Sequence, residues 1–437
     1  MLVRLYGKNF RSLRDSFELS MVAADLKREE DQNRGVVEVP IKGAEKPLRI
    51  LRTAAIYGPN GSGKSTVLTA ARALRWLGLE SSLRSKPDSP IPPYEPFLLD
   101  EATSSSPIEL GCDVVLQKSI LRYVVQYTQK RIVGESLCLL DGKKEKTLFE
   151  RLPSGEVQGS LITKRGANQL YVREMQPNVA VLAKLAQHGP SRGRESVHAY
   201  YRAIHNATDW QDYSIAASYM FGRSTRHEDR FADDGGYRDW IMSHLMRVAD
   251  VGISDVRTHR EGISLPDSIR EQFEKQGEGF KLPTERVVVS FVHDGKASSP
   301  IDFTDESSGT KKLFNISGDW WRLANEPVTL FADELSASLH PRLLDRLIRS
   351  VNDLPEGRAQ SQLIFTTHDT GLLESLDGLP PALRRDQVYF TKKDVEGSCS
   401  LYSLAEFKDD ARPVHNLRKR YLSGLYGALP SVEKLSL

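Results

Sequence analysis

One segment limits the possible folds of this chain more than any other: Gly58-Pro59-Asn60-Gly61-Ser62-Gly63-Lys64-Ser65. It follows the apolar stretch Leu51 to Tyr57 and precedes the helix-prone stretch Thr66 to Leu77. Its glycines let backbone N–H groups point inward around an anion, and the following helix adds the positive end of its dipole, about half an elementary charge. The order of strand, loop and helix predicts a cradle for the phosphates of ATP or GTP.

The side chains of this loop have tasks that follow from their chemistry. A triphosphate carries several negative charges, so we expect Lys64 to neutralise the β- and γ-phosphates and the Ser65 hydroxyl to bind Mg²⁺. A glycine-rich turn without a ligand is the alternative, and the complete pattern in its strand-to-helix context argues against it. The predicted nucleotide-binding residues of the loop are Asn60, Gly61, Ser62, Gly63, Lys64, Ser65 and Thr66.

Two acids follow a second buried strand. The run Val328 to Ala332 is apolar and β-branched, as a buried parallel strand requires, and Asp333 and Glu334 come directly after it. Carboxylates at the carboxyl end of such a strand face the ligand crevice. We therefore expect Asp333 to hold Mg²⁺ through water and Glu334 to polarise the water that attacks the γ-phosphate. The alternative is a pair of acids that caps a helix beginning near Ser336.

A third apolar run, Gln362 to Thr367, ends at His368 and Asp369. An imidazole at this position would hydrogen-bond the γ-phosphate or the attacking water, although a single histidine at a strand end is more often structural. With this residue, the predicted catalytic set is Glu334, His368 and Lys64.

The order and spacing of these motifs resemble those of the ABC-type ATPase heads of RecF, Rad50 and SMC. Within them, the chain is similar to the AAA-15/AAA-21 ATPases, and in particular to the RloA-like, OLD-like, PARIS and Septu anti-phage defence ATPases. The resemblance covers most of the chain and includes further segments: Asn9-Phe10-Arg11-Ser12, Tyr94 to Asp100, Glu306 to Phe314, His340-Pro341 and Tyr421 to Pro430. It implies an α/β fold, an ABC-type P-loop NTPase head with an antiparallel β meander and a helical insertion.

Further site residues follow from this resemblance. The signature residues Ser307, Ser308, Gly309 and Thr310 take the place of residues that contact the γ-phosphate bound to the opposite subunit. ATP held between two chains would make a homodimer or a higher even oligomer. Arg11 and Ser12 match a box that contacts the nucleotide, His340 takes the D-loop position, and His368 takes that of the switch histidine.

The chain departs from the family pattern at two places. Glu-Ser-Ser-Gly-Thr replaces the usual Leu-Ser-Gly-Gly-Gln signature, as in the AAA-15 subset. No Q-loop glutamine follows the first helix, and Gln117, Gln126 and Gln129 have no clear claim to that role.

Three regions differ in their pattern along the chain. Residues 1–164 are rich in strands and form the predicted amino-terminal lobe of the head, in which alternating segments from Ile108 to Leu140 predict the antiparallel meander. Residues 165–284 form a mainly helical insertion, and residues 285–437 form the carboxyl-terminal lobe with the signature, the acidic pair and the switch histidine. Ser81 to Pro96 and Gly189 to Arg194 have the composition of linkers.

Composition restricts the cellular context and the partners. Sixty Lys and Arg against fifty-eight Asp and Glu give a net charge of +2, so any nucleic-acid contact is a local patch. Three cysteines without a CxxC pair fit a reducing compartment and argue against a zinc site. Without an apolar run of about 18 residues or a secretion signal, we expect a cytoplasmic protein with no membrane partner.

The resemblance implies a function: an ATPase with ATP and Mg²⁺ as cofactors, which controls a separate effector, a nuclease or toxin, in an abortive-infection defence. The alternative is a RecF-like DNA-binding ATPase in repair or recombination, against which the near-neutral charge argues mildly. The energy subunit of a transporter is disfavoured by the signature, the opening motif and the long insertion. Basic and aromatic residues interleave in Arg192 to Arg202 and Arg223 to Tyr237, so a nucleic-acid contact and a solvated helix face both stay open.

Overall fold

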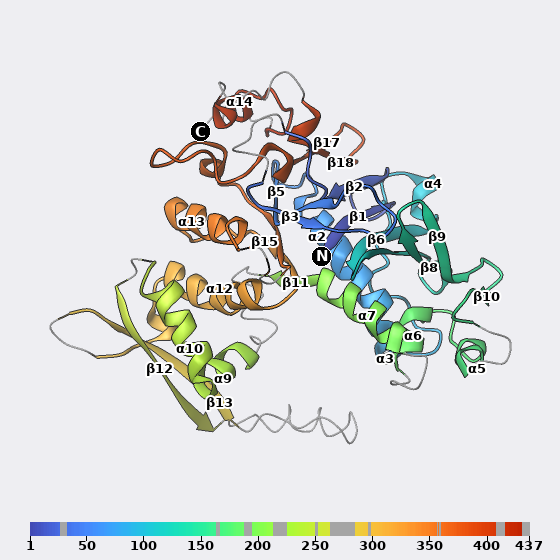
Figure 1. The fold of residues 1–437 in the computed structure, drawn as a ribbon, viewed down its shortest axis with the longest axis horizontal. Coiled ribbons are helices and arrows are strands. Elements are labelled where there is room, and N and C mark those ends of the chain that lie inside the picture. The colour runs from blue at the N-terminus through green and yellow to red at the C-terminus, as the bar shows by residue number, and fades with distance from the viewer. Residues whose placement is uncertain are drawn as a thin grey trace. The chain divides into compact units, whose positions relative to one another are not determined.

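The strand that leads into the glycine-rich loop is β5 (Thr53–Tyr57), and all of its side chains are buried in the computed structural model. It lies within a six-stranded sheet of order β11-β15-β16-β5-β17-β18, in which only β17 and β18 are antiparallel neighbours. Strands covered on both faces are apolar throughout, which explains the three apolar runs of the sequence. The remaining strands of this sheet are β11 (Asp209–Asp212), β15 (Thr329–Asp333), β16 (Gln362–Thr366), β17 (Val388–Lys393) and β18 (Cys399–Ser403), and Figure 1 labels all of these except β16.

A second, seven-stranded sheet is antiparallel and has the order β10-β9-β8-β7-β6-β1-β2. In β7, Leu121, Tyr123, Val125 and Tyr127 alternate with more exposed residues and are buried. The predicted meander is therefore confirmed. The strands are β1 (Leu2–Lys8), β2 (Phe17–Ser20), β6 (Ile108–Leu116), β7 (Ser119–Tyr127), β8 (Ile132–Asp141), β9 (Lys144–Arg151) and β10 (Val157–Gln158); β3 (Val36–Val39) and β4 (Leu48–Leu51) form a separate pair.

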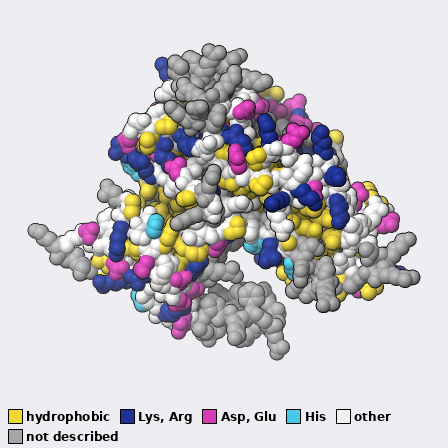
Figure 2. Space-filling model, in the orientation of Figure 1, with side chains coloured by type: hydrophobic (Ala, Val, Ile, Leu, Met, Phe, Trp, Pro, Cys, Tyr) yellow, Lys and Arg dark blue, Asp and Glu magenta, His cyan; other side chains and the backbone are white. Residues whose placement is uncertain are grey.

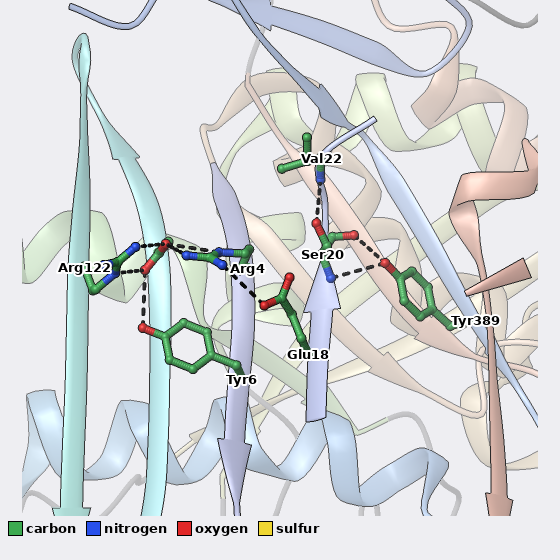
Figure 3. A network of polar contacts seen from close by, with 8 residues as sticks. Arg4, Tyr6, Glu18, Ser20, Val22, Arg122 and Tyr389 are labelled. Atoms are coloured by element: carbon green, nitrogen blue, oxygen red, sulfur yellow. Dashed lines mark hydrogen bonds and ion pairs between the residues drawn. The ribbon is translucent and has the colours of Figure 1, made fainter. Parts of the chain in front are cut away.

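A buried carboxylate ties three strands of the antiparallel sheet together. Asp113 on β6 accepts hydrogen bonds from Arg4 Nη2 at 2.5 Å and from Arg122 Nε at 3.0 Å. Figure 3 shows both arginines and Tyr6 turned toward this one carboxylate. Hydrogen bonds between charged partners are shorter and stronger than neutral ones, so this cluster fixes β1, β6 and β7 in register.

Helix α2 (Lys64–Arg75) follows the glycine-rich loop and packs into the main core. Val67, Leu68, Ala71 and Leu74 are buried at helical spacing and belong to one apolar cluster with residues of both sheets. Arg72 and Arg75 in the last turn complement the negative end of the helix dipole. The helix is thus anchored by burial along its length, which holds its first turn in place.

The other described helices range from the four residues of α3 to the 18 residues of α12. They are α3 (Ser81–Arg84), α4 (Glu101–Ser104), α5 (Ala167–Arg173), α6 (Val181–Gln187), α7 (Glu195–Ala207), α9 (Thr225–Asp233), α10 (Gly235–Ile241), α12 (Ser308–Asn325), α13 (Pro341–Asn352) and α14 (Leu417–Leu422). The π-helices are η1 (Trp76–Glu80) and η2 (Met242–Met246), and the 3-10 helices are η3 (Phe303–Asp305), η4 (Thr370–Leu373), η5 (Arg385–Gln387) and η6 (Leu404–Glu406). No helix within the described ranges is long and apolar enough to cross a membrane.

The structure describes residues 1–26, 33–162, 167–187, 195–212, 225–249, 252–262, 285–295, 299–355, 357, 360–407 and 416–430. The chain divides into two units: Met1–Asp212 with Leu323–Ser336 and Leu344–Leu437, and Tyr213–Arg322 with Ala337–Leu343. The three-part division by sequence stays a prediction about domains. The linker predicted at residues 189–194 lies outside the described residues, as do parts of the two basic and aromatic segments.

The second unit is built on an antiparallel sheet of β12 (Ile253–Gly262), β13 (Glu285–His293) and β14 (Ile301–Asp302). Its core gathers rings around Phe314, with ring centroids 4.8 Å from His227, 5.3 Å from Phe231 and 5.5 Å from Phe291. Strand β12 lies in the range predicted as mainly helical. Its second half, from Arg257 to Gly262, is polar and largely exposed. Such a strand has no alternating apolar pattern, which explains why the sequence did not predict it.

Candidate functional site

The glycines of the loop have positive φ angles, a backbone conformation that residues with a side chain rarely adopt. Gly58 has φ 153° and Gly63 has φ 95°. A Cβ at Gly58 would lie 2.4 Å from Thr391 Oγ1, and one at Gly63 would lie 2.9 Å from Cys399 Cβ, whereas nothing lies within 4 Å of a Cβ at Gly61. The loop is therefore packed closely against β17 and β18 at Gly58 and Gly63 and has open space at Gly61, as a phosphate cradle needs.

Two residues behind the loop were not predicted from the sequence. Thr391 Oγ1 lies 2.6 Å from Ser62 Oγ, and the Ser62 hydroxyl donates to the Pro59 carbonyl at 2.8 Å. Cys399 Sγ lies 3.9 Å from the Gly61 carbonyl oxygen, and burial raises the pKa of its thiol. These contacts hold the loop against β17 and β18. No motif in the sequence signals them, because Thr391 and Cys399 lie more than 300 residues after the loop.

Lys64 begins α2 and is buried. Its ammonium donates to the carbonyl oxygens of Gly58 and Pro59, both at 3.0 Å. Burial lowers the pKa of Lys64, and the negative charges of Asp333 and Glu334 oppose that change. Ser65, Asn60 and Gly61 are exposed, so the hydroxyl predicted to bind Mg²⁺ faces solvent at the first turn of the helix.

The acidic pair lies where the sequence analysis predicted it, at the carboxyl end of β15. Thr366 at the end of the neighbouring strand β16 donates its hydroxyl to Asp333 Oδ1 at 2.5 Å and accepts from the Glu334 N–H at 2.8 Å. Asp333 is half-buried and Glu334 is exposed with φ 50°, in the left-handed region. Carboxylate oxygens at this edge are the ligands that Mg²⁺ prefers.

His368 follows β16 and is exposed. Its pKa is lowered, first by partial burial and then by the positive charge of Lys64, while Glu334 and Asp333 act in the opposite direction. The imidazole is therefore neutral at pH 7 and lies within electrostatic reach of these three residues. Because β15, β16 and β5 are parallel neighbours, their carboxyl ends bring the predicted catalytic residues to one edge of the sheet.

The opening motif, Asn9 to Ser12, is joined by hydrogen bonds to the segment that begins at Tyr94. The Asn9 side chain is buried, donates to the Thr103 and Ser106 carbonyls at 2.8 and 3.0 Å, and accepts from the Phe97 N–H at 3.0 Å. It thereby holds the loop from Tyr94 to Asp100 beside the opening turn.

The next two residues of the opening motif, Arg11 and Ser12, contact side chains in the first turns of α2. Arg11 Nε lies 3.0 Å from Glu95 Oε2, and Arg11 Nη1 donates to Thr69 Oγ1 at 3.3 Å. Ser12 Oγ lies 3.2 Å from Thr66 Oγ1. A hollow of about 840 Å³ opens here, and its lining includes Arg11, Ser12 and Gln129. Of the three glutamines considered in the sequence, Gln129 thus lies beside the predicted nucleotide-binding residues.

The segment from Tyr421 to Pro430, singled out by the sequence resemblance, packs against the six-stranded sheet. The Tyr421 ring stacks on Phe390 of β17 at 5.3 Å. Arg418 donates to Thr370 Oγ1 at 3.0 Å and to Glu374 Oε1 at 2.7 Å, in the segment just after His368. Arg418 therefore supports the segment that follows His368.

The residues predicted to form the signature lie in the second unit, at the start of α12. Ser307 and Ser308 are exposed, Thr310 is buried, and Ser307 Oγ accepts the Thr310 N–H at 3.1 Å. This is a helix N-cap, so the first turn of an 18-residue helix presents N–H groups that favour an anion. The preceding Glu306 is held by His293 Nε2 at 2.5 Å.

His340 belongs to the second unit as well and is exposed. Its Nδ1 accepts the Arg342 N–H at 3.2 Å, and its carbonyl accepts the Leu343 N–H at 2.9 Å. In the structure this side chain therefore caps α13, and its D-loop role stays a prediction.

A strand, a glycine-rich loop and a helix, with a buried lysine and an acidic pair at one edge of a parallel sheet, define a P-loop nucleotide-binding protein. The chain belongs to the family described as "AAA domain, putative AbiEii toxin, Type IV TA system", whose model matches residues 54–374. The AAA-21 part of the sequence resemblance is thereby confirmed. A comparison with curated proteins gives no match.

Among solved structures, three SMC heads show low identity and low TM-scores. The SMC head domain from Thermotoga maritima is 13% identical, with 92% of this chain and 98% of that chain covered and a TM-score of 0.39. The SmcHead bound to the C-winged helix domain of ScpA is 13% identical (93% and 99% covered, TM-score 0.41). The Smc head domain with an extended coiled coil, bound to the C-terminal domain of ScpA derived from Pyrococcus furiosus, is 12% identical (97% and 99%, TM-score 0.40).

Proposed function

We propose that this chain is a cytoplasmic ATPase subunit of a prokaryotic, abortive-infection type defence against phage, in which ATP-dependent self-association controls a separate nuclease or toxin. The observation that carries the ATPase part is the meeting of Lys64, Asp333, Glu334 and His368 at one edge of the parallel sheet. The family description, which names a type IV toxin–antitoxin system, supports the link to an effector.

The residues present fit ATP with Mg²⁺. The loop has open space above Gly61, and Lys64 supplies a positive charge whose N–H donors now bond the Gly58 and Pro59 carbonyls and would turn to phosphate oxygens. Asp333 and Ser65 would hold Mg²⁺, which supplies further neutralisation of the β- and γ-phosphates. Arg11 and Ser12, which contact Thr69 and Thr66 of α2, would add further contacts to the nucleotide.

Hydrolysis would depend on the exposed carboxylate of Glu334 and on neutral His368. Glu334 orients a water molecule for attack on the γ-phosphate and accepts its proton. His368 donates a hydrogen bond to a γ-phosphate oxygen, for which the imidazole needs a proton on one nitrogen only. Its lowered pKa keeps it in this neutral form at pH 7.

Self-association would come from the start of α12. Ser307 and Ser308 are exposed there, and the N–H groups of the first turn are suited to the γ-phosphate of ATP bound to a second copy. Loss of that phosphate removes the shared charge and separates the two copies, which releases or activates the effector.

The RecF-like DNA-binding ATPase is less well supported. A protein that closes over duplex DNA needs a continuous basic surface. Figure 2 shows Lys and Arg side chains interspersed with Asp and Glu on the face drawn, in line with a net charge of +2. We therefore place DNA binding second.

The proposal is tested with Glu334→Gln, which keeps the shape of the side chain and removes its basicity. We expect ATP affinity to be retained and phosphate release to fall by about 10²–10⁴-fold, the usual contribution of a general base. Glu101→Gln, at an exposed position on α4, is the control and should hydrolyse ATP like the unmodified protein. Hydrolysis by Glu334→Gln at the unmodified rate would remove Glu334 from its role.

The effector part has a separate test. The protein and Glu334→Gln are each purified after co-expression with the product of the neighbouring gene, with and without ATP and Mg²⁺. Co-purification that changes with ATP supports control of an effector. Indifference to the neighbour, together with ATP-dependent and salt-sensitive DNA binding, would favour the RecF-like alternative.

A further inference from the structure

Thr366 is the last residue of β16 and has an exposed fraction of 1%. Its hydroxyl lies between two consecutive residues of the neighbouring strand end: 2.5 Å from Asp333 Oδ1 and 2.8 Å from the Glu334 backbone nitrogen. Its own carbonyl accepts the Leu335 N–H at 3.2 Å. One buried threonine therefore contacts three successive residues of the acidic turn.

The direction of these hydrogen bonds is fixed. The Glu334 N–H can only donate, so the Thr366 oxygen accepts from it. A threonine hydroxyl has a single proton, and the remaining partner, Asp333 Oδ1, is a carboxylate oxygen that accepts it. The hydrogen bond to Asp333 is therefore of the short, charge-assisted kind.

These two bonds act on different properties of the site. The bond to Oδ1 fixes the rotation of the Asp333 carboxylate. Thr366 does not bond Oδ2, so this oxygen is the one that would face a cation. The bond to the Glu334 N–H holds a residue with φ 50°, a left-handed conformation that is unfavourable for a non-glycine residue. Without the hydroxyl, the turn would lose one of the hydrogen bonds that hold this conformation, and the direction of the Glu334 side chain would be less firmly fixed.

We propose that Thr366 is a positioning residue of the site: its hydroxyl orients the Asp333 carboxylate toward a divalent cation and holds the turn that directs Glu334 toward water. This inference rests on the proposed ATPase function. Partners of metal ligands that lie one step behind the ligand contribute about 10–100-fold to metal affinity or activity.

The same strand pair offers a matched control. Thr329 at the other end of β15 is also buried, and its hydroxyl donates to Gln362 Oε1 at 2.8 Å. Thr329→Val thus removes a side-chain hydrogen bond between the same two strands, away from the acidic turn. A purely structural contribution of Thr366 would make Thr366→Val and Thr329→Val behave alike.

The experiment compares Thr366→Val, Thr366→Ala, Thr366→Ser and Thr329→Val with the unmodified protein. ATP affinity is measured with EDTA and with Mg²⁺, Mn²⁺ binding in the presence of ATP is followed by electron paramagnetic resonance, and phosphate release gives kcat. Thermal unfolding reports on the fold. The alanine variant serves the test if the valine methyl cannot be accommodated beside Asp333.

We expect the variants without the hydroxyl to bind ATP in EDTA like the unmodified protein, and to lose about 10–100-fold in Mn²⁺ affinity and in kcat. Thr366→Ser should restore both, and Thr329→Val should change neither. Unaltered Mn²⁺ affinity and kcat in Thr366→Val or Thr366→Ala, beside an active unmodified protein, would overturn the role of Thr366 alone. An unmodified protein that binds no ATP would overturn the proposed function and this inference with it.

Discussion

Lys64 carries its charge where burial opposes it. Its pKa is lowered by burial, and Asp333 and Glu334 offset part of that change. A buried ammonium that donates to two backbone carbonyls is hydrogen-bonded, and the carbonyls supply only partial negative charge. A triphosphate would supply full negative charge at this position, which is why a lysine here favours nucleotide over a neutral ligand.

The lowered pKa of His368 gives a pH prediction with a definite sign. Its unfolded value is 6.5, and the folded protein holds the imidazole neutral to lower pH. Between the two pKa values the unfolded chain binds more protons, so stability falls as the pH drops through 6.5 and the loss ends below the folded pKa. We expect hydrolysis to persist at pH 6.5 without a loss caused by His368. An NMR titration of the His368 ring checks this, and a midpoint at or above 6.5 would contradict it.

The sequence predicted the elements that follow local rules, and it missed those that depend on distant partners. The apolar runs became β5, β15 and β16, the alternating segments became the meander, and the glycine-rich loop led into α2. Strand β11 was missed because four residues with two aspartates give no strand pattern. Thr366, Thr391 and Cys399 were missed because a side chain's partner across a sheet is decided by tertiary structure.

The close packing of the glycine-rich loop against β18 yields a comparison of two alanine variants. Gly63→Ala meets a positive φ of 95° and Cys399 Cβ at 2.9 Å, whereas Gly61→Ala meets a positive φ of 73° and open space. Both carry the backbone cost, about 1–2 kcal/mol, and overpacking adds typically about 1–3 kcal/mol at Gly63. We expect Gly63→Ala to lower the free energy of unfolding more than Gly61→Ala in urea denaturation. Equal losses of unfolding free energy in the two variants would show that a methyl group at residue 63 causes no overpacking against Cys399.

The two segments predicted to bind phosphate belong to different units of the chain. The glycine-rich loop, the acidic pair and His368 belong to the first unit, and the helix start with Ser307 and Ser308 belongs to the second. Each lies at the start of a helix, α2 and α12, where the N–H groups of the first turn favour an anion. A net charge of +2 gives little repulsion between copies, which is compatible with the proposed association through ATP.

The mass of the assembly in solution tests whether ATP joins two chains. We expect Glu334→Gln with ATP and Mg²⁺ to give at least twice the single-chain mass by light scattering, and the single-chain mass without nucleotide. Adding Ser308→Glu should abolish the increase, because a carboxylate at this exposed position repels the γ-phosphate of the other copy, while an acid in the first turn stabilises α12 itself. Adding Lys64→Ala should abolish it for a different reason, the loss of ATP binding. A mass that doubles in the Ser308→Glu variant, or that never changes with ATP, would rule out association through the start of α12.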